Sequence, residues 1–492
     1  MIDVEAVFQR LTAGSGIPAI KSGWVYRYSH SPISLWCDLR VSEDCKDPIP
    51  QFTQYLFDQG MRHETAATSE FYPGGIREFY STEAEGFRRT LEMMAEGVAS
   101  IHNMPLLGGP AGLEGRPDVL ERVDDAPSDL GGYSYRVVEI KFARHIKQGH
   151  ILQAAAYNRL LGLAQGYEPE GFAVLNGDLQ FLPYGMSDWD GKLDNVLDAI
   201  REILAGGLVE PCYGAAEWPW ASYVNQLAVQ NNDVTLLTGI GAARRSNMVN
   251  AGFSRVDQVA VADESVLVEI KGIGLKTASM LKAAARALEE GQVIRRAPTP
   301  PVMRGRTEVF FDFEGTDPQV GSEGLEVTNY LIGNIWRKVN GTPEFQPFFT
   351  DTSPGEEANL RAFLDWANSL DDPVFYHWHS YELTHLKKMG EFYQVDPTQL
   401  EWVTDRMVNL VPPVTDSFAF PCYGRGLKDI AKALGFRWRQ DDVDGAGSVV
   451  LFRRFVDSGG ADVETKQKIL IYNEDDCMAT MFVFDWLLAQ EE

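Results

Sequence analysis

The sequence predicts a multidomain α/β protein in which a small, all-helical module separates two α/β domains. Its 492 residues exceed the size of one ordinary domain. Near both ends, short β-like runs alternate with helical patterns, which is typical of α/β folds. Between the ends, a Gly-x-Gly turn followed by a helical pattern occurs twice. We therefore expect domains at residues 1–230, 231–292 and 305–492, with a linker at 293–304.

The composition indicates a folded protein without a membrane span. Hydrophobic residues make up 45% of the chain, which argues against disorder. The longest apolar runs, such as residues 469–472, are far shorter than a bilayer-spanning helix. The chain opens with Asp3 and Glu5 rather than with a signal peptide. We expect a cytoplasmic protein with no membrane partner. Its five scattered cysteines contain no CxxC pair and are expected to be reduced.

Charge is unevenly distributed along the chain. The formal net charge of −26 is unusual for a protein that binds nucleic acid, because such proteins commonly have a basic surface. Residues 1–230 contribute −13 and residues 305–492 contribute −16, whereas residues 231–304 contribute +3. The acidic ends disfavour nonspecific phosphate binding. They remain compatible with metal–carboxylate chemistry, because a bound cation reverses the local charge.

The first domain contains a candidate site at the ends of two predicted strands. Asp118 precedes the first of them, and Glu139 and Lys141 end the second, where residues two apart share a face. Asp118 and Glu139 can hold Mg²⁺ or Mn²⁺ through carboxylate oxygens, and Lys141 can orient the attacking water. A lone Glu-x-Lys also occurs on many solvated strands. The expected strands lie at 119–123, 135–140 and 171–175, and the expected helices at 84–99, 151–164 and 193–204.

Two features beside these strands strengthen the interpretation of a site. A helix follows the second strand and carries Gln153 and Tyr157 at positions i and i+4, which lie on one face. Upstream, the helical stretch 60–64 contains His63, which can act as a third metal ligand. The alternative for His63 is a surface or packing role.

Together these residues resemble the PD-(D/E)XK nuclease superfamily, and specifically its RecB-like branch. That branch combines an upstream Gly-x-x-His, a GxxD strand, a (D/E)xK strand and a QxxxY helix. The resemblance covers residues 30–210 and implies a restriction-endonuclease-like core. The functional residues that it implies are the metal ligands His63, Asp118 and Glu139, the catalytic lysine Lys141, and the substrate-contacting Gln153 and Tyr157.

The cysteines depart from the pattern of this branch. Many RecB-like relatives bind an iron–sulfur cluster through one early cysteine and three that follow the core. Cys37 and Cys212 stand where the first two of these would be, but the rest of the later group is absent. We therefore expect no iron–sulfur cluster, with Trp218 and Trp220 packing in its place. This departure leaves the activity of the first site open.

The middle domain contains a weak repeat of the sequence Gly-Ile-Gly, 33 residues apart. Each copy precedes a predicted helix, at 242–251 and 275–288, whose N-terminal amides can receive a phosphate. The pattern resembles the helix-hairpin-helix motif, which binds nucleic-acid backbones without reading sequence. The alternative is a helical spacer with two glycine caps. The residues expected to contact nucleic acid are Gly239, Gly241, Arg244, Gly272, Gly274 and Lys276.

The third domain contains a second set of carboxylates. Asp312 and Glu314 share one face of a predicted strand at 307–313, and they repel one another unless a cation lies between them. In a long helical pattern at 464–488, Tyr472 and Asp476 stand at i and i+4. A further acid, Glu382, begins a helix after an apolar strand. The other elements expected here are a strand at 330–336 and helices at 356–370 and 427–434.

This order of residues resembles the DEDD exonucleases of the ribonuclease-H-like fold, such as DnaQ-type proofreading domains. The resemblance spans residues 306–490 and is reinforced by the segment 415–417, which looks like a strand of that family, and by the Leu427-Lys428 helix start. It implies that Tyr472 orients water and that the carboxylates hold two metal ions. The metal ligands that it implies are Asp312, Glu314, Glu382 and Asp476.

One ligand departs from this family. Glu382 stands where the family has Asp, and its longer side chain shifts the ligand by one methylene group. Asp416 is a nearby alternative acid. A degenerate fold that is kept for binding or dimer contacts is the alternative reading of the whole domain. His377, His379 and His385 have no accompanying cysteine, so we expect polar roles for them rather than a zinc site.

The order of the three parts resembles a bacterial family of RecB-like putative nucleases, over nearly all of the chain. We expect a two-site nuclease that uses Mg²⁺ or Mn²⁺ and acts on DNA rather than RNA, in repair, recombination or defence. The chain contains no GxxxxGK[ST] sequence, so any ATPase activity must come from a protein partner. Two alternatives stay open: a nucleic-acid-binding scaffold or complex subunit with decayed sites, and an RNA exonuclease that uses only the C-terminal site.

Overall fold

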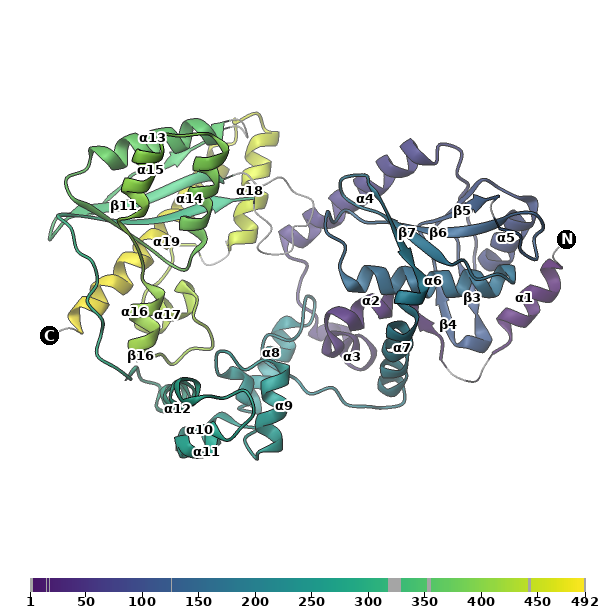
Figure 1. Cartoon of the computed structure of the whole chain (residues 1–492), viewed down its shortest axis with the longest axis horizontal. Helices are drawn as coiled ribbons and strands as arrows, with labels where there is room; N and C mark the ends of the chain where they lie inside the picture. The colour runs from purple at the N-terminus through teal and green to yellow at the C-terminus, as the bar shows by residue number, and fades with distance from the viewer. Residues whose placement is uncertain are drawn as a thin grey trace. The chain divides into compact units, whose positions relative to one another are not determined.

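The computed structural model describes residues 3–14, 16, 18–124, 126–316, 329–351, 355–440 and 444–490 (Figure 1). The chain divides into two compact units after Gln226. The first unit contains the elements expected for the first domain. The second contains both the helical module and the C-terminal α/β domain. Among the described residues, no helix combines the length and the apolarity that crossing a bilayer requires.

The N-terminal unit contains two β-sheets. The larger sheet has the strand order β2-β5-β6-β7-β8, and the smaller has the order β1-β4-β3. In the larger sheet β5 pairs antiparallel with β6, and β6 pairs parallel with β7. The strands are β1 (Ile20–Lys21), β2 (Ser100–His102), β3 (Leu106–Gly108), β4 (Leu113–Gly115), β5 (Val119–Val123), β6 (Ser134–Ile140), β7 (Gly171–Leu175) and β8 (Phe181–Gly185).

Helix α6 (Gln148–Gln165) lies in the core of this unit. Most of its residues are buried, and it contacts β6, β7 and α2. A helix that is apolar on all sides is typical of such a central position. The expected strands at 119–123, 135–140 and 171–175 are confirmed as β5, β6 and β7. The other helices are α1 (Val4–Thr12), α2 (Ser22–His30), α3 (Pro32–Arg40), α4 (Gln51–Phe71), α5 (Glu83–Glu96) and α7 (Asp190–Leu204).

The helical module begins the second unit. Its helices α9 and α12 start directly after Gly241 and Gly274, as the repeat predicts. Two residues of the expected linker form β9 (Ile294–Arg295), which pairs antiparallel with β16 (Phe418–Ala419) of the α/β domain. The first residues of the expected linker are therefore part of the folded α/β domain. The helices are α8 (Ala221–Gln230), which crosses the division, α9 (Ala242–Asn250), α10 (Val256–Val261), α11 (Glu264–Val268) and α12 (Leu275–Glu290).

The C-terminal α/β domain is built on a mixed sheet with the strand order β12-β11-β10-β14-β15, and β13 also pairs with β11. Strand β10 is antiparallel to β11 and parallel to β14. Both long strands are confirmed close to their expected bounds. The strands are β10 (Thr307–Gly315), β11 (Asn329–Lys338), β12 (Glu344–Phe345), β13 (Phe348–Phe349), β14 (Pro373–His377) and β15 (Met407–Asn409).

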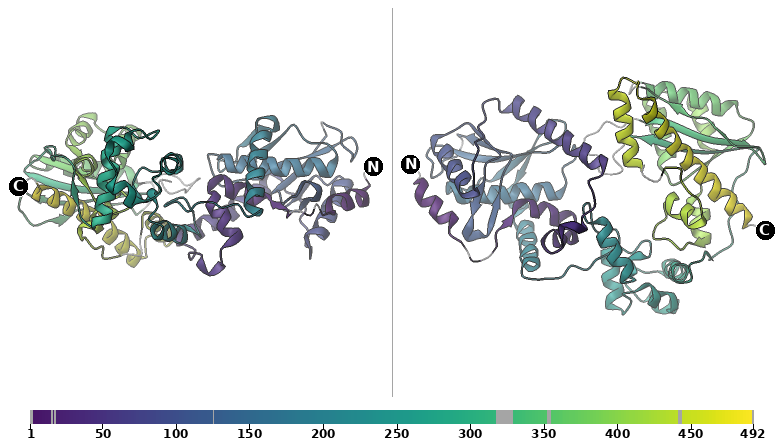
Figure 2. Two further views of the ribbon diagram at one scale, coloured as in Figure 1. Left: turned by 90° about the horizontal axis from the view of Figure 1, so that it is seen from below. Right: turned by 180° about the vertical axis from the view of Figure 1, so that it is seen from behind.

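Helices cover both faces of this sheet. Helices α13 and α14 cover one face and α19 covers the other (Figures 1 and 2). Phe311 and Phe313 of β10 pack with residues of α13 and α14, whereas Phe310 packs with residues of α19. Because side chains alternate along a strand, Asp312 and Glu314 share the α19 face with Phe310. The helices are α13 (Glu356–Ser369), α14 (Tyr381–Phe392), α15 (Pro397–Thr404), α16 (Val411–Ser417), α17 (Leu427–Leu434), α18 (Gly445–Asp457) and α19 (Val463–Ala489).

One expected strand of this domain is wrong. Residues 415–417 end the helix α16, which has proline in its first turn. Proline is well tolerated there, because the amide that it lacks has no partner within the helix. In contrast, the helix expected at 427–434 is confirmed as α17.

Candidate active sites

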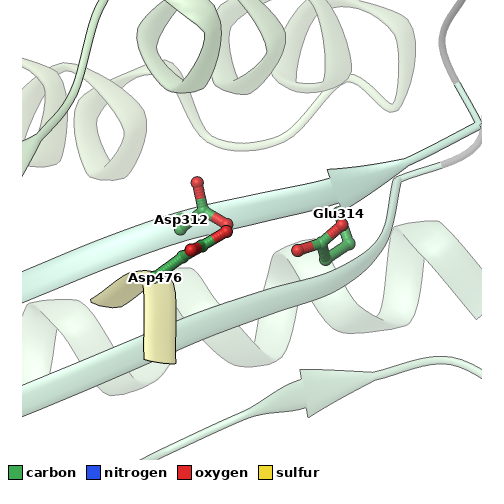
Figure 3. A group of neighbouring side chains, drawn as sticks. All are labelled: Asp312, Glu314 and Asp476. Carbon is green, nitrogen blue, oxygen red and sulfur yellow. The ribbon is translucent and has the colours of Figure 1, made fainter. Parts of the chain in front are cut away.

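Three carboxylates of the C-terminal domain lie together. Asp312 and Glu314 come from β10 and Asp476 from α19, and one oxygen of each lies within 4.8 Å of the others (Figure 3). Glu314 and Asp476 are buried, and Asp312 is partly exposed. The alternation of β10 and the packing of α19 on the same face bring these side chains together from positions more than 160 residues apart.

A glycine allows α19 to approach the sheet closely. Gly333 of β11 pairs with Asp312 in the strand register. A Cβ atom at Gly333 would lie 1.4 Å from Oδ1 of Asn473. Asn473 is buried on α19, and its Nδ2 donates a hydrogen bond of 3.0 Å to Oδ2 of Asp312. The absence of a side chain at Gly333 therefore makes room for the amide that holds Asp312 in place.

The electrostatics of this cluster disfavour three ionised carboxylates. Burial and the charge of Asp476 raise the pKa of Glu314 to about 8. Burial and the charges of Glu314 and Asp476 also raise the pKa of Asp312 well above its usual range. Mutual repulsion of this kind is relieved by a cation between the carboxylates. The donor set, which consists of oxygens alone, fits Mg²⁺ or Mn²⁺.

Three neighbours keep Asp476 closer to its ionised form. Burial raises the pKa of Asp476, but the charge of Lys428 and hydrogen bonds from Trp438 and Tyr472 act against this shift. Trp438 Nε1 donates to Asp476 Oδ1 at 2.6 Å. Lys428 Nζ lies 4.6 Å from the centroid of the Tyr472 ring. Sequence reasoning placed Tyr472 here but missed Trp438 and the part that Lys428 plays, although it noted the Leu427-Lys428 helix start.

Glu382 lies next to this cluster but outside the group within 4.8 Å. It is buried in the first turn of α14 and pairs with His377 Nδ1 at 3.2 Å. Its charge contributes to the raised pKa of Asp312. The alternative acid Asp416 is more than half exposed and pairs with Lys276 at 3.5 Å. The role of Glu382 as a fourth acid stays a prediction.

The two other histidines considered for zinc lie apart from the carboxylate group. The ring of His385 stacks on Tyr381 with a centroid distance of 3.9 Å. His379 follows β14 with a positive φ of 66°. Within the residues that the structure describes, neither belongs to a group of three metal-ligating side chains.

The N-terminal unit brings its three candidate catalytic residues together. Lys141 Nζ lies 2.8 Å from Glu139 Oε2 and 3.6 Å from Asp118 Oδ2. The backbone fixes both carboxylates, because the amide of Asp118 donates to Glu139 Oε1 and the amide of Ile140 donates to Asp118 Oδ2. This reciprocal pattern follows from the antiparallel pairing of β5 and β6.

Burial sets the electrostatics of this second group. Burial and the charge of Asp118 raise the pKa of Glu139 to about 8, against the opposing effect of Lys141. Burial alone would lower the pKa of Lys141, but the charges of Glu139 and Asp118 outweigh it and raise that pKa. Lys141 therefore stays cationic beside the carboxylates and can position an oxygen nucleophile or a phosphate oxygen.

His63 has the hydrogen-bonding pattern of an oriented ligand, although the structure does not group it with Asp118 and Glu139. Its ring donates to the backbone carbonyl of Asn176, and its Nε2 is buried without a hydrogen-bond partner among the described residues. Metal-ligating histidines commonly donate their other ring nitrogen to a backbone carbonyl in this way. Burial lowers the pKa of His63, which favours the neutral form that binds metals. Its role as a ligand stays a prediction.

Gln153 and Tyr157 lie beside this group on α6. Gln153 Nε2 donates to the Tyr157 hydroxyl at 3.1 Å. Burial, followed by the charge of Glu139, raises the pKa of Tyr157, which places its hydroxyl near the carboxylate. Gly115 makes room for this ring, because a Cβ there would lie 2.4 Å from Tyr157 Cε1. Contact of the pair with substrate stays a prediction.

Cys37, one of the two cysteines considered for a cluster, lies in the hydrophobic core. Cys37 is fully buried and packs with Trp220 and Val224 in one hydrophobic cluster. Of the two tryptophans expected to pack in place of a cluster, Trp220 packs with Cys37. Trp218 instead donates to the carbonyl of Pro48. Burial raises the pKa of Cys37 to about 11, so its thiol stays protonated.

The two hairpins of the helical module share their backbone geometry. Gly239 and Gly272 both adopt positive φ angles, 91° and 88°, which favour glycine. Gly241 and Gly274 are the N-caps of α9 and α12, so the free amides of both helices follow the turns. Arg244 Nη1 donates to the Gly239 carbonyl at 2.6 Å. Lys276 is 79% exposed on the second hairpin.

Comparisons with known proteins identify two parts of the chain. Residues 309–488 match the RNase_H superfamily model, and residues 232–287 match the SAM-like helix-hairpin-helix tandem model. The chain is therefore a mixed α/β protein with a ribonuclease-H-like domain and a helix-hairpin-helix module. Both ranges lie within 232–488, so the resemblance of the first domain to PD-(D/E)XK nucleases stays a prediction. No curated protein matches the chain.

A solved structure, described as exonuclease I in complex with inhibitor BCBP, is similar to part of the chain. It shares 14% sequence identity and has a TM-score of 0.21. The match covers 33% of this chain and 43% of that protein, so this chain spans less than half of the length of the neighbour. A match at this TM-score does not by itself indicate a shared fold or activity.

Proposed function

We propose that the protein is a nuclease that hydrolyses phosphodiester bonds, with its C-terminal site formed by Asp312, Glu314, Asp476 and the adjacent Glu382. The observation that carries this proposal is the carboxylate group within 4.8 Å in a domain of the RNase_H superfamily. The four acids would hold Mg²⁺ or Mn²⁺. A bound divalent cation supplies Lewis-acid stabilisation of the charge that develops on the phosphate oxygens.

The neighbouring residues position the acids and the substrate. Asn473 holds Asp312, and Trp438 holds Asp476, so that both carboxylates keep their orientation without a ligand. Tyr472 donates to Asp476 and can accept a hydrogen bond from an attacking water. Lys428 places a positive charge beside the same tyrosine, where it favours the approach of a phosphate.

We extend this proposal to a second nuclease site formed by Asp118, Glu139 and Lys141. Its support is the reciprocal bonding of the two acids and the lysine at 2.8 Å from Glu139. In this site Lys141 would orient the attacking water, Asp118 and Glu139 would hold Mg²⁺ or Mn²⁺, and His63 would be a third ligand. Gln153 and Tyr157 would contact the substrate.

The helical module supports nucleic acid as the substrate class. Both hairpins present the amides of a helix N-terminus after a glycine turn, an arrangement suited to phosphates. We propose DNA rather than RNA, in repair, recombination or defence, with a protein partner for any ATP-driven step.

The first test is the degradation of end-labelled single-stranded DNA, double-stranded DNA and RNA with Mn²⁺. Wild type, Lys141→Ala, Asp312→Asn and the double variant are compared, with the exposed Lys192→Ala as a control. We expect each single variant to lose a distinct activity by roughly 10³-fold and the double variant to lose both. Loss of a single RNA-directed activity in Asp312→Asn alone would instead indicate an RNA exonuclease.

A scaffold without nuclease activity is the second candidate. The net charge of −26 favours it, because acidic faces suit a basic protein partner better than a polyanion. The same assay separates the two functions. Wild-type protein that leaves every substrate intact with Mn²⁺ and with Mg²⁺ contradicts the nuclease and supports the scaffold.

A further inference from the structure

A small pocket lies where the helical module meets the α/β domain within the C-terminal unit. Thr238 and Met280 line it from the module, and Thr415 and Phe420 line it from the domain. The antiparallel pairing of β9 with β16 and the contacts of α12 with both strands join these two parts. The pocket is thus built from both parts that the proposed function assigns to nucleic acid.

Two arginines line this pocket. Arg296 Nη1 donates to the Thr415 carbonyl at 2.9 Å, whereas its Nε is buried without a hydrogen-bond partner among the described residues. Arg425 Nη2 lies 2.6 Å from Met280 Sδ, and Trp378 Nε1 holds the Arg425 carbonyl at 3.1 Å. In the part of the chain that the structure describes, neither guanidinium forms an ion pair with a carboxylate.

The two positive charges influence one another. Burial lowers the pKa of Arg296, and the charge of Arg425 adds to this effect. The charge of Asp416, which acts on Arg296 more strongly than that of Arg425, and the charge of Glu264 both act in the opposite direction. Asp416 is exposed and paired with Lys276. Two guanidinium groups that repel one another beside an unsatisfied buried donor favour an anion that bridges them. Arginine forks match the oxygens of a phosphate, which accepts several hydrogen bonds at once.

The pocket is connected along the chain to both nucleic-acid elements. Thr238 directly precedes Gly239 of the first hairpin. Arg425 lies three residues before Lys428, whose ammonium group faces Tyr472 beside the carboxylates. The three residues from Arg425 to Lys428 span at most about 11 Å of backbone. Roughly three nucleotides of one nucleic-acid strand cover the same distance. Positive charges therefore occur both in the pocket, at Arg296 and Arg425, and beside the tyrosine of the acidic site, at Lys428.

We propose that Arg296 and Arg425 form a phosphodiester-binding site that guides a nucleic-acid strand from the helix-hairpin-helix module to the C-terminal carboxylates. The ligand is a backbone phosphate, held by guanidinium hydrogen bonds without contact to the base edges. This inference rests on the proposed function for the identity of the strand. Its chemistry, however, requires binding alone and not hydrolysis.

The test measures the binding of a fluorescent single-stranded oligonucleotide to the full chain in EDTA, where no metal-dependent cleavage occurs. Arg296→Gln and Arg425→Gln are each expected to weaken binding about 10-fold at low salt. Each is also expected to lower the slope of log K against log salt by about 0.7. The control is Arg306→Gln, which removes the same charge from a side chain that is 72% exposed and paired with Asp371.

The proposal would be overturned if Arg296→Gln and Arg425→Gln bind the oligonucleotide with the same affinity and the same salt slope as Arg306→Gln. A second arm measures thermal stabilisation by inorganic pyrophosphate. In one outcome, pyrophosphate raises the Tm only when both arginines are present, while wild type binds no oligonucleotide. This result would identify a site for free phosphates and would also overturn the proposal of a strand-binding site. The binding assay in EDTA is independent of cleavage. Arginine-dependent binding in EDTA by a protein that cleaves no substrate in the separate assay with Mn²⁺ would uphold the site while contradicting the nuclease.

Discussion

Asp312→Asn is expected to abolish the C-terminal activity and at the same time to stabilise the metal-free protein. Its carboxylate lies in a group of three acids within 4.8 Å, and burial with its neighbours raises its pKa. An amide of the same shape removes one of the repelling charges and keeps an oxygen for Asn473. Functional sites commonly carry such a stability cost. We expect a loss of activity of roughly 10³-fold or more.

The stabilisation has a defined pH dependence. The folded-state pKa of Glu314 is about 8, above the value of about 4.3 of an unfolded glutamate. Between these values the folded state binds more protons than the unfolded state, so the free energy of unfolding falls as the pH rises. The folded-state pKa of Asp312 is also raised, so Asp312 adds to this fall and Asp312→Asn removes its contribution. Its gain over wild type should be absent near pH 4.5 and reach about 1–3 kcal/mol near pH 8.

Thermal unfolding in EDTA from pH 4.5 to pH 8 measures this difference. Asp365→Asn, which changes an exposed aspartate of α13, is the matched control and should follow wild type. Added Mg²⁺ should raise the Tm of wild type, because it binds only the folded state, and should raise that of Asp312→Asn much less. A variant with a lower metal-free Tm than the control at pH 8 would contradict the repulsive cluster.

Local patterns predicted much of the C-terminal site. The two-residue period of β10 placed Asp312 and Glu314 on one face, and the four-residue spacing of α19 paired Tyr472 with Asp476. Both rules depend on positions close in sequence. The site also requires α19 to pack on the same face of the sheet as these carboxylates. This packing depends on apolar residues such as Phe310 and Phe484, whose rings lie 5.3 Å apart.

Contacts between residues that are distant in sequence cannot be predicted from such local patterns. A single sequence does not show that Trp438 donates to Asp476 or that Arg425 shares a pocket with Arg296. The family resemblance predicts a strand at 415–417, whereas the prolines at 412 and 413 are typical of the first turn of a helix. In the first domain, the strand period and the Glu-x-Lys spacing were sufficient to place Asp118, Glu139 and Lys141 together.

Gly333→Ala is expected to be among the most damaging single changes in the C-terminal domain. The new Cβ would lie 1.4 Å from Asn473 Oδ1 and 2.6 Å from its Cγ. Asn473 is buried, so it can avoid the methyl group only by leaving Asp312 or by moving α19 away from the sheet. We expect a destabilisation of about 1–3 kcal/mol, the range for overpacked cores, and a loss of most C-terminal activity.

A double-mutant cycle separates this clash from a general effect of alanine. Asn473→Ala removes the atoms that the new methyl group meets, so Gly333→Ala/Asn473→Ala should be more stable than the sum of the two single changes predicts. Gly445→Ala is the control, because a Cβ at that position meets no atom within 4 Å. Chemical unfolding gives the four free energies of the cycle.

Activity should not return in the double variant, because Asp312 has lost its hydrogen-bond donor. Additive free energies would show that α19 does not need the glycine, and the positioning of Asp312 by Asn473 would then need another explanation.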